Sequence, residues 1–138
     1  NMPIIGFNFD RIIVERLDKI KKGMKIKSDL SIKSLEKEEL DVGTAGNVIK
    51  VNFDFSVSYD PNMGNISLQG HVLFMEDQAK IDMILNEWEK SKGLEKEIAP
   101  ILLNTILARC NIKALAMTQE VNLPPHIRLP MVKPGTKK

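Results

Sequence analysis

The chain has 138 residues, of which 43% are hydrophobic and 28% are charged, and its formal net charge is +2. These ordinary globular values predict one domain, large enough to bury a core without disulfides or a structural metal. The near balance of charge does not favour nucleic-acid binding, and the single cysteine excludes an internal disulfide. We find no signal peptide and no membrane-length apolar run, so we expect a cytoplasmic protein without membrane insertion.

The first 46 residues are expected to form two strands and a loop. Apolar positions in residues 7–20 change phase around residues 11–14, which is typical of a strand that contains a bulge. Residues 24–33 alternate between apolar and mainly lysine or serine side chains, which predicts a second strand suited to a sheet edge. The charged, glycine-containing residues 36–46 predict a longer loop.

Residues 47–75 carry the clearest pattern in the chain. Apolar side chains occupy every odd position from Ile49 to Tyr59, and the alternation resumes on even positions from Ile66 to Phe74. A period of two indicates strands with one buried face. Between them, residues 60–64 contain proline, asparagine and glycine, and we expect the glycine to accept a positive φ. The pattern predicts a long antiparallel hairpin, and with the preceding strands a four-stranded antiparallel sheet.

After Asp77 the apolar period changes from two to about 3.6, which predicts helices. Residues 78–90 read as an amphipathic helix with Asp77 as N-cap. Residues 95–117 read as a second helix, with Pro100 either in its first turn or at a kink. Apolar residues surround most of this second helix, so either the first helix or a second subunit must cover its other side, and we favour the subunit.

The last segment is extended and proline-rich. Residues 121–130 are expected to pack back along the domain through Leu123, Ile127 and Leu129. Residues 133–138 are expected to be a disordered basic tail, which leaves residues 1–132 as the single domain.

No familiar catalytic or metal-binding pattern is present. The two histidines, His71 and His126, and the single cysteine, Cys110, have no zinc-site spacing, and Cys110 lies in an apolar helical run that favours an inert thiol. Residues 43–46 lack the lysine of a phosphate-binding loop. We therefore expect no catalytic residue, no metal and no cofactor, and the sequence favours binding over catalysis. Most aromatic and methionine side chains should form the core, with Met83 and Trp88 the best candidates to border an exposed groove.

The order of these elements resembles the SecB-type protein-export chaperones. The resemblance lies in the opening FNFDRI (residues 7–12), the hairpin 48–75, the helix start APIL (residues 99–102) and the VNLPP that follows the helix (residues 121–125). It covers roughly residues 7–130. It implies an α+β fold in which a four-stranded antiparallel sheet is followed by two helices packed on one face, SecB-like.

The resemblance also implies a function. Members of this family are ATP-independent holdases that bind non-native or preprotein polypeptides in hydrophobic grooves and assemble as dimers or tetramers, partly through the first strand and the long helix. Carried onto this chain, the resemblance implies a client-binding set: Phe53, Phe55, Tyr59, Met83, Trp88 and Leu129. It implies an oligomer interface that includes Phe9, Ile13, Ile106, Cys110 and Leu115.

The C-terminal tail departs from the family, because it is basic where family members carry an acidic tail that docks the export motor. This departure argues against coupling to such a motor. A non-enzymatic oligomeric scaffold or adaptor, without a client groove, is the alternative function.

Overall fold

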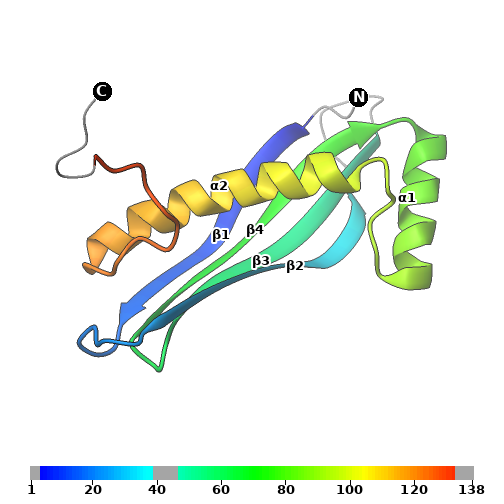
Figure 1. The fold of residues 1–138 in the computed structure, drawn as a ribbon. Helices are drawn as coiled ribbons and strands as arrows, with labels where there is room; N and C mark the ends of the chain where they lie inside the picture. The colour runs from blue at the N-terminus through cyan, green and yellow to red at the C-terminus, as the bar shows by residue number, and fades with distance from the viewer. Residues whose placement is uncertain (1–3, 39–46, 133–138) are drawn as a thin grey trace.

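The computed structural model describes residues 4–38 and 47–132 (Figure 1). Its elements are β1 (Ile4–Arg16), β2 (Lys25–Glu38), β3 (Asn47–Asp60), β4 (Gly64–Glu76), α1 (Gln78–Ser91) and α2 (Ala99–Glu120). The strands form one sheet in the order β1-β4-β3-β2, with every neighbouring pair antiparallel. The predicted fold class is confirmed. Most of the predicted loop and the whole predicted tail lie outside the described residues.

Several element boundaries differ from the prediction. β1 ends at Arg16 rather than at residue 20, because the Leu17 and Asp18 amides donate to the Met63 carbonyl where the chain crosses the end of the hairpin. β2 continues through residues 36–38, which had been assigned to the loop. α2 begins at Ala99, because residues 95–98 form a separate turn, and Pro100 lies in the first turn of the helix.

The predicted bulge in β1 is present. The register of β1 against β4 shifts between Phe9 and Arg11. Phe9 lies opposite Gly70 before the shift, and Ile12 lies opposite Leu68 after it, so both halves of the strand present apolar residues to the same face. The extra residue explains why the apolar positions change phase along the sequence.

The hairpin β3–β4 forms the centre of the core. Every odd position of β3 from 49 to 59 and every even position of β4 from 66 to 74 is buried. In the turn, Asn62 adopts the left-handed conformation with φ of 52°. The expectation of a positive φ at Gly64 is wrong: glycine is required there because a Cβ would lie 2.8 Å from the Glu15 carbonyl oxygen and 2.9 Å from Leu123 Cδ2.

The helices supply the second layer of the core. α2 lies across the sheet, and α1 stands beside one end of it (Figure 1). α2 buries one residue per turn, namely Leu102, Ile106, Cys110, Ala114 and Thr118. α1 buries Ile81, Ile84 and Trp88, and the Asp77 side chain accepts a hydrogen bond from the Lys80 amide at 2.9 Å, as its predicted N-cap role requires.

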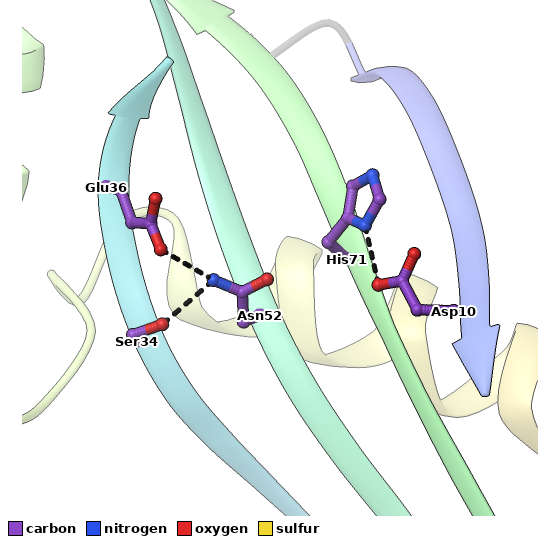
Figure 2. Close-up of polar contacts among 5 residues, drawn as sticks. All are labelled: Asp10, Ser34, Glu36, Asn52 and His71. Atoms are coloured by element: carbon purple, nitrogen blue, oxygen red, sulfur yellow. Dashed lines mark hydrogen bonds and ion pairs between the residues drawn. The ribbon is translucent and has the colours of Figure 1, made fainter.

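Polar contacts join neighbouring strands on the opposite face of the sheet (Figure 2). On this face Asn52 donates to Ser34 at 2.8 Å and to Glu36 at 3.1 Å, linking β3 to the edge strand β2. The Asp10 carboxylate lies 2.8 Å from His71 Nδ1, so the extra residue of the β1 bulge is tied to β4. These contacts connect neighbouring strands, so we assign them a structural role.

By length and composition alone, α2 is apolar enough to cross a membrane, with a mean hydropathy of 1.2 over its best window. The helix is not an uninterrupted apolar run, however, because it contains Asn104, Arg109 and Lys113. The test is weak evidence for a membrane span, because the core helix of a soluble protein passes it as well, and α2 seals one side of this core.

Candidate functional site

Most of the predicted client-binding residues belong to the core. Phe53, Phe55 and Tyr59 are at most 1% exposed, and Trp88 is 8% exposed. The reason is the strand alternation itself, since the odd positions of β3 face the helices. These four side chains pack in the core and do not line an open groove in this structure, so their client-binding role stays a prediction.

Met83 is the exposed member of the predicted pair on α1. Its side chain is 48% exposed and borders a cavity of about 400 Å³ between α1 and the connection to α2. Glu87, Leu94, Glu95 and Lys96 complete the lining. The cavity therefore combines apolar walls with charged groups, and Glu95 Oε1 is buried without a hydrogen-bond partner among the described residues.

One ion pair holds the connection against α1. Lys80 Nζ lies 2.7 Å from Glu97 Oε1. The hydrogen bond between them raises the pKa of Lys80 and lowers the pKa of Glu97. Both groups are solvated, so we assign the pair a small contribution to stability.

The other exposed residue of the predicted set, Leu129, is 41% exposed on the segment after α2. This segment lies at the opposite end of α2 from α1 (Figure 1). The structure therefore does not bring Met83 and Leu129 into one groove.

The stripe of α2 directly opposite its buried row, here called the outward face, carries no charge, and the exposed Arg109 lies beside it. The residues opposite the buried row are Ile101, Asn104, Thr105, Ala108, Ile112, Leu115, Ala116 and Gln119. Ile101 is 50% exposed and Ile112 is 70% exposed. α1 does not cover this face, which is exposed in the single chain, and its cover by a second subunit stays a prediction.

The predicted interface residues divide between the two sides of α2. Ile106 and Cys110 are fully buried against the sheet, so their assignment to an oligomer interface is wrong. Leu115 is half-buried at the outward face. The helix is apolar on both sides, and only packing on the sheet decides which side is hidden.

The two β1 residues assigned to the interface are both half-buried, but they lie on opposite faces of the sheet. Phe9 packs edge-to-face on Phe7 and Phe53, and the Lys113 ammonium lies 5.7 Å from its ring centre, so the chain itself covers part of this side chain. Ile13 is half-buried on the opposite face of the sheet, beside Ser67, on an edge strand.

Residues 121–130, which we call the C-terminal arm, cover the part of β3 that α2 leaves open. Leu123 is 5% exposed, whereas Ile127 and Leu129 are exposed to about 40%, so the predicted packing is confirmed mainly at Leu123. The Tyr59 hydroxyl donates to the Pro124 carbonyl, and Arg16 donates to the Asn122 carbonyl.

His126 provides a further attachment of the arm. Its Nε2 lies 2.8 Å from Asn111 Oδ1, and its ring packs edge-to-face against Phe55 at a centroid distance of 6.4 Å. Sequence reasoning missed His126 and the Tyr59 hydroxyl, because neither their spacing nor their residue type indicates contact between segments 65 or more residues apart.

The pKa values of the buried titratable groups do not favour acid-base or nucleophilic catalysis. Burial raises the pKa of the Cys110 thiol and of the Tyr59 hydroxyl to about 12 each. Burial also lowers the pKa of His126, whose buried Nδ1 has no hydrogen-bond partner among the described residues. Within residues 4–38 and 47–132 no three potential metal ligands lie together. The surfaces present can bind apolar or extended partners.

Comparison with known proteins gives a fold but no sequence relative. No protein-family model and no curated protein matches the sequence. Among solved structures, the chain is similar to the SecB-like chaperone Rv1957 of Mycobacterium tuberculosis, solved in complex with a ChAD peptide from the Rv1956 HigA1 antitoxin. The TM-score is 0.58 at 10% identity, over 98% of this chain and 93% of the other. The likeness defines the class: this chain has a SecB-like fold.

Proposed function

We propose that this protein is an ATP-independent chaperone that binds non-native or extended polypeptides, as a SecB-like holdase. The observation that carries the proposal is a SecB-like fold across almost the whole chain, shared with a chaperone solved with a bound peptide. No protein-family model and no curated protein matches the sequence, so the fold and the surfaces described above support the proposed function.

The exposed apolar surface supports a binding role. Met83 at the α1 cavity and the arm offer apolar contacts to a partner, and burial of such groups supplies affinity without nucleotide. An unfolded client loses conformational entropy when it binds, so each local contact is expected to be weak.

Self-assembly belongs to the same proposal. We assign the outward face of α2, with Ile101, Ile112 and Leu115, to contact with a second copy, and Ile13 on β1 to an accessory position. A helix face of this length without charge is unfavourable in water, and a symmetric pair of such faces would cover both at once.

The test is suppression of aggregation of a denatured model protein, followed by light scattering, with the mass of the chaperone determined in parallel. Met83→Ser should weaken suppression, whereas the matched Met131→Ser, at an 86% exposed position, should not. An oligomer that leaves aggregation unchanged would replace the holdase with the scaffold or adaptor function.

A further inference from the structure

The arm and α2 cover different parts of the sheet. α2 lies over β1, where the Arg109 guanidinium is 4.4 Å from the Phe7 ring centre and Lys113 lies over Phe9. The arm instead meets Phe55 and Tyr59 on β3. One end of the apolar core is therefore closed by a segment without regular secondary structure.

The arm is held by few contacts. Along residues 122–132, one backbone-to-backbone hydrogen bond is made, from the Leu123 amide to the Thr118 carbonyl. Leu123 is the one apolar side chain of the arm that is nearly fully buried, and beyond it exposure rises to 86% at Met131 and 92% at Val132. A segment with one buried anchor and little backbone hydrogen bonding opens more readily than the sheet or the helix.

The polar contacts recognise the main chain of the arm. Arg16 and Tyr59 donate to the carbonyls of Asn122 and Pro124, which flank Leu123 on either side. Any peptide has carbonyls at these positions, so the two contacts do not depend on sequence.

Between the two carbonyl contacts, Gly64 leaves room for the Leu123 side chain, since a Cβ on Gly64 would lie 2.9 Å from Leu123 Cδ2. The resident segment enters this position through a turn, because Asn122 has a φ of 58° and the Leu123 amide donates to the Thr118 carbonyl. An apolar pocket between two hydrogen-bond donors, Arg16 and Tyr59, is the pattern expected of a site for a short peptide segment.

We propose that this surface, formed by Arg16, Phe55, Tyr59, Gly64 and Asn111 and here called the arm seat, is a binding site for a short segment of an unfolded client polypeptide. The segment would place a leucine-like side chain in the Leu123 position, and the C-terminal arm is the resident occupant that a client displaces. The inference rests on the proposed chaperone function and names where one client segment binds. It also returns Phe55 and Tyr59 to a client-binding role, because displacement of the arm would uncover them.

The test uses the full chain and a fluorescent peptide with the sequence of the arm, VNLPPHIRLP. In the wild-type protein the tethered arm competes at a high effective concentration, so the peptide should bind weakly. Leu123→Ala removes the anchor of the tethered arm but not of the added peptide, so the peptide should bind at least about tenfold tighter. Val132→Ala, at an exposed position just beyond the arm, should bind the peptide as the wild type does.

Three results would overturn the assignment. The first is unchanged peptide affinity in Leu123→Ala while circular dichroism shows a folded protein. The second is equal binding of a peptide in which alanine replaces the leucine that corresponds to Leu123. The third concerns His126→Ala, which is used if Leu123→Ala does not fold. This variant keeps Leu123 as the core anchor but loosens the arm at the ring contact of His126, so unchanged peptide affinity in it would also overturn the assignment.

Aggregation suppression measured on the same variants separates the two proposals. Suppression without peptide binding would refute the arm seat and leave the holdase in place. Peptide binding without suppression would support the arm seat and refute the holdase.

Discussion

Ile112→Lys tests the outward face of α2 directly. Ile112 is 70% exposed in the single chain, so the substitution removes no core contact and places a charge at the middle of an uncharged face. Lysine forms helices about as well as other straight-chain residues, so the folded chain should keep its stability. The affinity between copies of the chain should fall instead.

The size of the loss follows from the exposed area. Full burial of an isoleucine side chain contributes about 1.5–3 kcal/mol, so covering the exposed part of Ile112 contributes roughly 1–2 kcal/mol per copy. A two-fold interface contains the residue twice, which gives roughly 2–4 kcal/mol and a dissociation constant weakened by roughly 30- to 1,000-fold. A lysine buried without a partner would increase this loss.

Sedimentation over a concentration series measures the effect, with urea unfolding as the check on the fold. Ala79→Lys is the matched control, because it adds the same charge at an exposed position of α1. Ile106→Ala should instead lower the folding stability, by about 2–5 kcal/mol, because it leaves a cavity in the core. An assembled Ile112→Lys protein with wild-type affinity would refute the assignment of this face.

Three further predictions concern the core and the arm. Gly70→Ala should destabilise the protein by about 1–3 kcal/mol or more in urea unfolding, because a Cβ would lie 2.3 Å from the Asn8 carbonyl and 2.7 Å from the Phe53 ring; wild-type stability would contradict this packing. Burial lowers the pKa of His126 below its ordinary 6.5, so its contribution to stability is complete above pH 6.5 and is lost as the pH falls through the folded-state pKa; the hydrogen-exchange protection factor of the Leu123 amide, which corrects for the intrinsic pH dependence of exchange, should fall on acidification in the wild type but not in His126→Gln. Cys110 should react with a thiol reagent only at the rate of unfolding, because its thiol is buried and its pKa is raised to about 12; fast reaction in native buffer would contradict its burial.

The sequence predicted the elements whose signals are local. The odd and even alternation around residues 60–64 located the hairpin, and the phase change in β1 located its bulge. The side chain of Asp77 and the position of Pro100 located the two helix starts to within a few residues. Each of these signals is contained in one short stretch of chain, which is why it could be read without the fold.

The candidate site was less predictable, because periodicity shows that a face is apolar but not what covers it. The alternation that marks Phe55 and Tyr59 is the same for a core strand and for a groove wall. On α2 the row containing Ile106 and the row containing Ile112 are both apolar, and only the packing on the sheet distinguishes them. The arm contacts join residues as far apart as Arg16 and Asn122, which no local pattern indicates.

The two proposed uses of this chain lie on separate surfaces, and this separation can be tested. The outward side of α2 points away from the sheet, whereas the arm seat lies on the sheet and includes one residue of the helix, Asn111, whose side chain contacts His126 of the arm. Sites without shared contacts are expected to act additively. Ile112→Lys should therefore leave peptide binding at the seat unchanged in the Leu123→Ala background, and Leu123→Ala should leave the mass of the assembly unchanged. If either substitution changes both properties, assembly and client binding share one surface, and the arm would then have to reach the neighbouring copy.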